Sequence, residues 1–267
     1  MKTVILCGGF GTRLSEETHI RPKPMVEVGG KPILWHIMKL YAHYGFNDFS
    51  LALGYKGEHI KNYFLNYHPH NSNITIDLST GKAAYENSSI EDWSVYLKDT
   101  GKESQTGGRL HRLQPQLEQG GTFMLTYGDG VANLDIEKLV KFHRSHGKIA
   151  TVTSVRPPAR FGTMTFDGDQ VVNFSEKPQT GEGWINGGFF VFEPEIFKYL
   201  SGDQTILERE PLENLAKDRQ LMAYKHEGFW HPMDMLRDRN FLHGLCEKDE
   251  APWMLWEKAH NKELETA

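Results

Sequence analysis

A short apolar run that leads directly into a glycine-rich turn opens this chain and limits the folds available to it. Residues 2–6 read Lys-Thr-Val-Ile-Leu, a continuous run typical of a buried parallel strand. Gly8, Gly9 and Gly11 follow at once. Glycines let the backbone approach a ligand closely, and consecutive backbone N–H groups form an anion-binding hollow. Arg13 adds a charged fork suited to phosphate oxygens, so the opening predicts a phosphate-binding loop.

The spacing of the glycines separates this loop from two common nucleotide-binding patterns. The Rossmann fingerprint requires G-x-G-x-x-G and the Walker loop ends in Gly-Lys-Ser/Thr, and this stretch has neither spacing. Lys23 lies between Pro22 and Pro24, which stiffen its backbone. The stretch therefore indicates a triphosphate cradle with two cations, Arg13 and Lys23, directed at it.

Length and composition bound the class of protein. A chain of 267 residues can form one large α/β domain with an ample core, and its pI near 6.2 argues against a nucleic-acid partner, which needs a basic face.

We find no apolar run of about 18 residues and expect no membrane span. The chain enters a strand at once, unlike a signal peptide. Cys7 and Cys246 have neither zinc nor disulfide spacing, so we expect a cytoplasmic protein.

Strand and helix patterns alternate along the first half of the chain. Helical periodicity predicts helices at 33–44, 58–64 and 134–145. Apolar runs predict strands at 49–53, 74–78, 123–126 and 150–155. This alternation implies parallel strand–helix–strand units. Further along, the patterns predict strands at 162–166, 171–174 and 188–192, then helices at 206–217 and 235–247. We expect the later strands to be antiparallel and to lie at one edge of the sheet.

The predicted fold is therefore α/β, with a Rossmann-like, mixed but mainly parallel sheet flanked by helices. We see no linker or repeat and predict a single domain over 1–267. A polar segment at about 81–105 interrupts the alternation, and long insertions of this kind are usually lids or interfaces. Alternating residues at 93–97 indicate a strand inside it. We interpret the segment as a partly ordered arm at a subunit contact.

Several motifs point to one family. They are GGFGTRL at 8–14, PKPM at 22–25, GGKP at 29–32, TGGRL at 106–110, TYGDG at 126–130, EKP at 176–178, INGGFF at 185–190 and FWHPMD at 229–234. In this order they resemble the sugar-1-phosphate nucleotidylyltransferase family, over nearly the whole chain. TYGDG, FWHPMD and the 81–105 segment resemble its cytidylyl branch. Phe10, His231 and Met235 stand where that branch usually has Leu, Gln and Thr, which bears on the shape of the pocket.

The resemblance implies a nucleotide-diphospho-sugar transferase fold and one reaction. CTP and α-D-glucose 1-phosphate would give CDP-glucose and pyrophosphate, with Mg²⁺ as the cofactor, in bacterial surface-polysaccharide synthesis. A homo-oligomer is also implied, with a hexamer as the candidate assembly. Two alternatives remain: the same reaction with dTTP or UTP, and a non-catalytic nucleotide-sugar-binding regulator. An NAD-binding oxidoreductase is disfavoured by the glycine spacing.

Two carboxylates are the candidate metal ligands. Asp129 follows a buried strand and lies between two glycines, so it could form a simple Asp-Gly turn; beside the glycine cradle we favour a Mg²⁺ ligand. Asp234 precedes a predicted helix, and from the residues alone an N-cap is favoured. The resemblance makes Asp234 the second metal ligand.

The remaining roles follow from the resemblance. The predicted catalytic residues are Arg13, Lys23 and Asp129. The predicted nucleotide-binding residues are Leu6, Cys7, Gly8, Gly9, Phe10, Gly11, Thr12, Arg13, Lys23, Ser104, Arg109 and Gly128. Ser104 and Arg109 would border the base, with a plain loop as the alternative. The predicted sugar-phosphate-binding residues are Gly162, Glu176, Lys177, Asn186 and Gly187, with Glu176 on the sugar hydroxyls and Lys177 on the phosphate.

Overall fold

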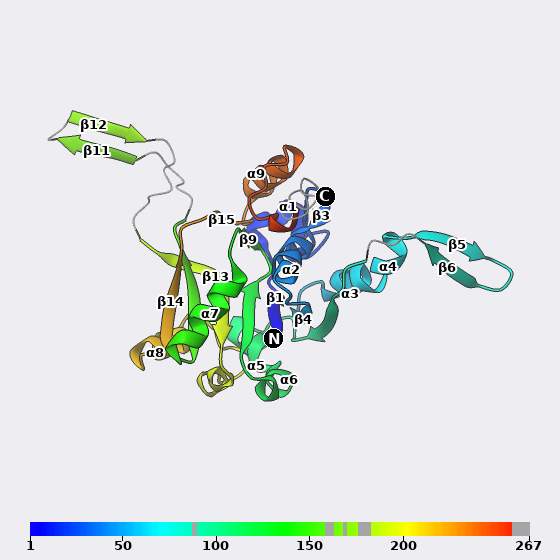
Figure 1. Ribbon diagram of the computed structural model, residues 1–267, viewed down its shortest axis with the longest axis horizontal. Helices are drawn as coiled ribbons and strands as arrows, with labels where there is room; N and C mark the ends of the chain where they lie inside the picture. Colours follow the sequence, from blue (N-terminus) through cyan, green and yellow to red (C-terminus); the bar gives the residue numbers. More distant parts are fainter. Residues whose placement is uncertain (87–89, 158–162, 168–169, 176–182, 258–267) are drawn as a thin grey trace, which may run out of the picture.

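A seven-stranded mixed sheet forms the centre of the molecule (Figure 1). The computed structural model describes residues 1–86, 90–157, 163–167, 170–175 and 183–257. In sheet order the strands are β14 (Leu221–His226), β10 (Ala150–Val155), β13 (Ile185–Phe192), β8 (Phe123–Tyr127), β1 (Thr3–Cys7), β4 (Asp48–Leu53) and β7 (Ser94–Asp99). Only β13 runs antiparallel to its neighbours, so the prediction of a mainly parallel sheet is confirmed.

The position of β13 corrects one prediction. We expected antiparallel strands at an edge, whereas β13 lies inside the sheet between β10 and β8. The reason is the run Gly187 to Phe192, which is buried throughout and would lose that burial at an edge. The other two predicted strands, β11 (Thr163–Asp167) and β12 (Gln170–Ser175), pair with each other outside the central sheet.

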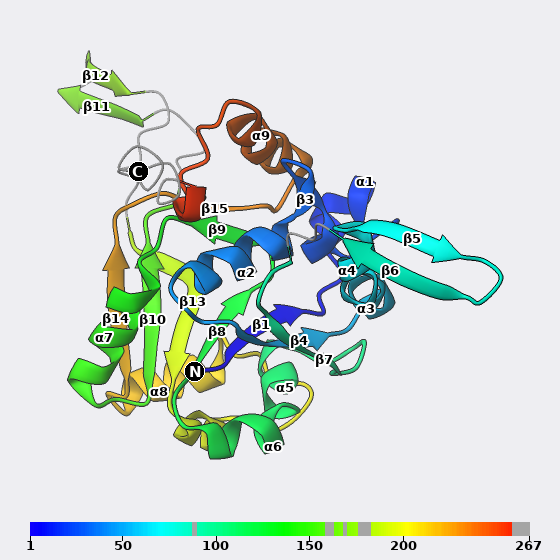
Figure 2. The same ribbon diagram turned by 45° about the vertical axis from the view of Figure 1, so that its right-hand side comes forward.

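Helices cover both faces of the sheet because side chains of each strand alternate between two apolar clusters. Ile5 and Cys7 point into a cluster with α2 (Ile33–His43) and α7 (Ile136–His146). Val4 and Leu6 point into the opposite cluster. That second cluster includes side chains of α5 (Thr106–His111), α6 (Gln114–Leu117) and α8 (Glu210–Lys217). The result is a three-layer α/β/α arrangement (Figure 2).

Shorter elements connect these layers. The remaining helices are α1 (Ser15–Thr18), α3 (Gly57–Leu65), α4 (Tyr67–His70) and α9 (Leu236–Glu247), with 3-10 turns at Thr12–Leu14, Lys23–Met25, Glu118–Gly120 and Pro194–Tyr199. Two further pairs of short strands are β2 (Glu27–Val28) with β3 (Lys31–Pro32), and β9 (Gly130–Ala132) with β15 (Trp230–Pro232). Among the described residues, no helix has the length and apolar character needed to cross a membrane.

The polar insertion is divided between two places. Residues 74–78 were predicted to continue the parallel units, but β5 (Asn73–Asp77) pairs with β6 (Lys82–Glu86) in an antiparallel hairpin that projects from the body (Figures 1 and 2). Both strands are exposed at every residue. The strand predicted at 93–97 exists as β7, and it is the edge strand of the central sheet. The projecting arm is therefore the hairpin 73–86, not all of 81–105.

Candidate active site

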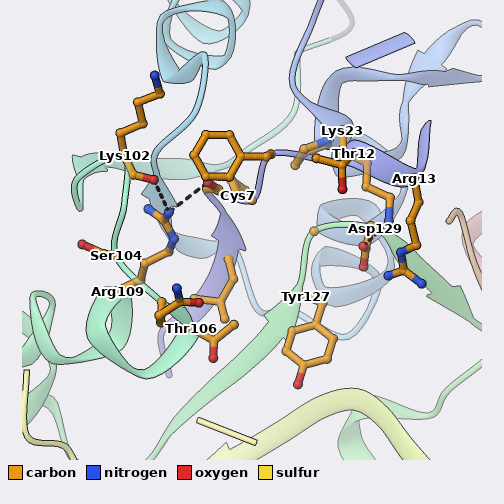
Figure 3. Close-up of a pocket in the computed structure, with 18 of the residues that line it drawn as sticks. Cys7, Thr12, Arg13, Lys23, Lys102, Ser104, Thr106, Arg109, Tyr127 and Asp129 are labelled. Atoms are coloured by element: carbon orange, nitrogen blue, oxygen red, sulfur yellow. Dashed lines mark hydrogen bonds and ion pairs between the residues drawn. The ribbon is translucent and has the colours of Figure 1, made fainter. Parts of the chain in front are cut away.

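The carboxyl ends of the parallel strands surround a cavity of about 600 Å³ (Figure 3). The loop after β1, the turn after β8 and the segment after β7 each contribute to its wall, as expected for an open α/β sheet. Its lining consists of Leu6 to Arg13, Lys23, Pro24, Lys102 to Thr106, Arg109, Tyr127 to Asp129, Asn186 and Glu208. All twelve residues predicted to bind the nucleotide therefore line one cavity.

Local backbone geometry shapes the glycine loop. Gly11 has φ +64°, a left-handed conformation that a residue with a side chain adopts at a cost. A Cβ on Gly128 would lie 2.8 Å from the carbonyl oxygen of Leu6, so the turn after β8 presses against the end of β1. Glycine at both positions lets the two strand ends approach each other and open a backbone-lined hollow between them.

The two predicted metal ligands meet because the strands beside them pair. Gly130 of β9 lies opposite Pro232 of β15, and Met233 N–H donates to Asp129 O at 2.7 Å. This pairing brings Asp129 and Asp234 together. Asp234 is not the N-cap of α9: Met235 occupies that position.

Lys23 joins the two carboxylates. Its Nζ donates to Asp129 Oδ2 at 2.7 Å and to Asp234 Oδ1 at 2.8 Å, and the residue is only 8% exposed. Arg13 Nη1 lies 2.8 Å from Asp234 Oδ2. Burial acts against the charge of Lys23, but the two carboxylates outweigh it, and the net effect raises the Lys23 pKa. Arg13, Lys23, Asp129 and Asp234 thus form one charged cluster at one side of the cavity.

The carboxylates have the geometry and chemistry that suit a hard cation. Oxygens of Asp129 and Asp234 converge on a single position, where the Lys23 ammonium now lies. In the described part of the chain there is no cluster of three or more His, Cys, Asp or Glu that could hold a metal. Two carboxylates completed by phosphate oxygens and water are a common arrangement for Mg²⁺, so these residues fit that ion.

A smaller hollow of about 210 Å³ adjoins the charged cluster and shares Arg13, Tyr127, Asp129 and Asn186 with the large cavity. Gly187 also lines it, and Trp230 Nε1 donates to the Gly187 carbonyl at 2.8 Å. Two of the predicted sugar-phosphate-binding residues therefore lie next to the charged cluster. Gly162, Glu176 and Lys177 lie outside the described residues.

Sequence reasoning missed a hydrogen-bonded group on the floor of the cavity. Tyr127 Oη donates to Glu208, and Thr106 Oγ1 donates to the other oxygen of that carboxylate at 2.6 Å. Asn186 Nδ2 donates to Tyr127 Oη at 3.0 Å. Burial first, and then the Glu208 charge, raise the pKa of Tyr127. Tyr127 adjoins the predicted metal turn and could have been noticed; nothing in the sequence around Glu208 marks it.

The predicted base side lies on the opposite wall from the charged cluster (Figure 3). Ser104 and Arg109 are both buried there, at 8% and 4% exposure. Cys7 lies deep at the end of β1, and burial raises the pKa of its thiol, which makes it an inert wall residue. Phe10 is 41% exposed, at the mouth, with Lys102 Nζ 6.0 Å from the centre of its ring.

Comparisons with known proteins show the family to which this chain belongs. A model of the nucleotidyl transferase family matches residues 2–231. The glucose-1-phosphate cytidylyltransferase of Salmonella typhi is 51% identical over 96% of this chain and 100% of its own length. The mannose-1-phosphate guanylyltransferase catalytic subunit beta of Dictyostelium discoideum is 31% identical over 92% of this chain and 64% of its own.

Solved structures share the fold. HddC from Yersinia pseudotuberculosis superposes with a TM-score of 0.66 at 24% identity, covering 92% of this chain and 98% of its own. That likeness concerns the fold alone. The family model spans most of the chain, and the Salmonella typhi enzyme matches nearly all of it; this chain belongs to the nucleotidyl transferase family.

Proposed function

We propose that this protein transfers the cytidylyl group of CTP to α-D-glucose 1-phosphate, giving CDP-glucose and pyrophosphate. The observation that carries the proposal is the charged cluster of Arg13, Lys23, Asp129 and Asp234, set between a cavity large enough for a nucleotide and a smaller hollow. The choice of CTP and glucose is supported by the activity named for the Salmonella typhi relative.

The reaction needs positioning and charge stabilisation more than proton transfer. A phosphate oxygen of glucose 1-phosphate attacks the α-phosphorus in line, a new P–O bond forms, and the bond to the β-phosphate oxygen breaks. The attacking oxygen is already anionic, so no general base is required. Holding the two reactants in line and neutralising charge on the transferring phosphoryl group then supply the catalysis.

Each member of the charged cluster has a role in this scheme. Lys23 keeps its charge at neutral pH, because the two carboxylates outweigh the effect of burial on its pKa, and it would hold the α-phosphate. Arg13 is the more exposed cation and presents a planar fork that would grip the leaving pyrophosphate.

Asn186 and Gly187 would border the glucose, and we retain Glu176, Lys177 and Gly162 as proposed sugar contacts.

We propose Mg²⁺ as the cofactor, held by Asp129 and Asp234. When bound, the ion supplies positive charge at the phosphate oxygens and helps to orient them. Lys23 Nζ, which pairs with both carboxylates in the free protein, would contact the substrate phosphate. Arg13, now paired with Asp234, would likewise turn toward the phosphates.

The preference for cytosine is assigned to the wall formed by residues 104–109. Cytosine presents an N4 amino donor where uracil presents a carbonyl acceptor. A site that accepts from the amino group leaves unpaired polar groups when uracil binds, at about 1–3 kcal/mol for each. The experiment is to measure pyrophosphate release with glucose 1-phosphate and CTP, UTP or dTTP in turn. Activity with UTP or dTTP above that with CTP would replace the proposed nucleotide and keep the reaction.

We further propose a cytoplasmic homo-oligomer that serves polysaccharide synthesis, with the hairpin β5–β6 at a contact between copies. Ile76 is 58% exposed and Leu78 is 90% exposed, and a lone two-stranded hairpin is marginally stable in water. Light scattering on the parent and on Ile76→Lys tests this. A smaller assembly is expected for the variant; an unchanged mass would remove the hairpin from the contact.

A further inference from the structure

The side chain of Arg109 runs from α5 beneath the glycine loop and is almost completely buried. Its Nη1 group donates to Gly101 O at 2.7 Å, to Thr100 Oγ1 at 2.9 Å and to Leu53 O at 3.2 Å. Leu53 ends β4, and the other two acceptors follow β7. One nitrogen therefore contacts the segments that follow two neighbouring strands.

The second terminal nitrogen of Arg109 extends this contact to the phosphate loop. Nη2 donates to Gly8 O at 2.9 Å and to Lys102 O at 3.2 Å. Gly8 begins the glycine loop after β1, so three strand ends are joined through one guanidinium. Figure 3 shows the Arg109 side chain bonded to Lys102 in the cavity wall. We call Arg109 and these acceptors the Arg109 brace.

The brace uses most of the hydrogen-bonding capacity of the side chain. A guanidinium has five N–H donors, and the four on Nη1 and Nη2 serve the five acceptors of the brace. All five acceptors are neutral, and among the described residues no carboxylate forms an ion pair with Arg109. Gly8 O also accepts from Tyr55 N–H, and Leu53 O also accepts from Thr100. Loss of the guanidinium would cost stability mainly at Gly101 O and Lys102 O, which accept from Arg109 at 2.7 and 3.2 Å. Such an arrangement is typical of a side chain that fixes backbone.

Two glycines make room for the guanidinium. A Cβ on Gly8 would lie 2.1 Å from Arg109 Cζ, and a Cβ on Gly54 would lie 2.4 Å from Arg109 Nη1. Neither distance is compatible with the brace. Gly54 does not line the cavity, whereas Gly8 does. A substitution at Gly54 can therefore displace the Arg109 guanidinium without changing Arg109 itself or any residue that lines the cavity.

We propose that Arg109 is a positioning residue, which holds the glycine loop, the end of β4 and the 100–102 segment in one geometry, and that it does not discriminate between pyrimidines. This inference rests on the proposed function, because it assigns the cavity to the nucleotide. Nucleotide affinity and phosphate alignment then depend on Arg109 through Gly8 and Lys102. The choice of CTP over UTP is made by other groups on the wall.

The first test compares kcat/KM for CTP and for UTP in three variants. Arg109→Lys keeps a charge but has no planar fork, and Gly54→Ala displaces the fork. For both we expect a loss on the order of a hundredfold, equal for the two nucleotides. Arg112→Ala, one turn on and in a surface pair with Asp203, is the matched control and should retain activity. A CTP/UTP ratio that collapses in the first two variants would overturn the proposal.

The second test needs no nucleotide and separates failure of the brace from failure of the proposed function. Hydrogen–deuterium exchange on the free protein should show residues 8–14 and 100–103 exchanging faster together in Gly54→Ala, and not in Arg112→Ala. Unchanged exchange in both segments would contradict the brace, because the segments would then keep their conformation without the Arg109 contacts. This outcome does not depend on the identity of the substrate.

A double variant completes the design. In an Arg109→Ala background the added methyl group of Gly54→Ala meets no guanidinium, so it should have little further effect on exchange or on kcat/KM. Full additivity would show that Gly54 acts independently of Arg109 and would contradict the brace. If Arg109→Ala does not fold, the same comparison is made on Arg109→Lys.

Discussion

Lys23 Nζ lies 2.8 Å from Asp234 Oδ1, although 211 residues separate the two in sequence. The same ammonium lies 2.7 Å from Asp129 Oδ2. A cation thus already lies between the carboxylates that we propose as Mg²⁺ ligands. Lys23 balances their charge in the free protein, and we propose that it also holds the substrate phosphate. These two roles lead to the first two predictions.

Replacing Lys23 should affect stability as well as turnover. Lys23→Ala leaves Asp129 and Asp234 facing each other without the shared cation, so we expect a lower melting temperature in the absence of Mg²⁺. Added Mg²⁺ should restore more of the melting temperature in the variant than in the parent, because the ion can lie between the carboxylates. Turnover should fall by about a thousandfold or more.

Lys39→Ala is the control for that experiment. Lys39 is partly buried and pairs with Glu91 at 2.6 Å, away from the cavity. Its loss should lower stability without changing turnover or the response to Mg²⁺. Near-normal turnover in Lys23→Ala would show that the loop assignment is wrong.

Neutralising either carboxylate should weaken metal binding. Asp129→Asn and Asp234→Asn keep the shape but lose the charge that a hard cation favours. We expect each to raise the Mg²⁺ concentration needed for half-maximal rate, and to weaken Mn²⁺ binding measured by electron paramagnetic resonance. If Asp234→Asn leaves both measurements unchanged, Asp234 serves only to pair with Lys23 and Arg13.

The Tyr127 hydroxyl should matter for the alignment of substrates. Tyr127→Phe removes the donor to Glu208 and the acceptor for Asn186 while keeping the ring. Glu208 and Asn186 line the cavity and would lose this contact, so their alignment with substrate should suffer and kcat/KM should fall about tenfold to a hundredfold. Tyr85→Phe, on the exposed hairpin, should be silent. Parent-like kinetics in Tyr127→Phe would show that this hydroxyl does not align the substrates.

Acid should destabilise the protein partly through His36. This ring is buried against Trp253 Nε1–H and Val28 O, and burial lowers its pKa from the ordinary 6.5 to about 4. The unfolded chain therefore takes up the proton first, so the contribution is complete above pH 6.5 and is lost as the pH falls toward 4. The full loss is about 3 kcal/mol.

Urea unfolding at several pH values measures that loss. His36→Gln should flatten the pH dependence between pH 6.5 and 4, while His59→Gln, at an exposed position, should not. If the slope for His36→Gln equals that of the parent, another group controls acid unfolding.

The sequence predicted the core of the fold well where one signal dominated. The apolar run of β1 and the periodicity of α2 depend on burial alone, and both elements lie within one residue of the predicted bounds. The hairpin β5–β6 was misplaced because its alternating residues resemble a half-buried strand, and local pattern cannot tell which partner a strand has. β13 was misplaced in the sheet for the same reason: pairing is a long-range property.

The candidate site was predictable in its phosphate half and less so elsewhere. Gly8 was recognised as a close approach, but its neighbour is the Arg109 guanidinium, 101 residues away in sequence. Glu208 was missed because its contacts with Tyr127 and Thr106 come from separate elements. Residues whose role depends on distant partners leave no local mark, whereas a glycine loop after a strand does.

The most direct test of the account is the rate of pyrophosphate release from each nucleoside triphosphate with glucose 1-phosphate and Mg²⁺. We predict release with CTP at a kcat/KM about tenfold to a hundredfold above that with UTP, and no release when glucose 1-phosphate is omitted. Equal rates with all nucleotides, or no release with any of them, would contradict the account.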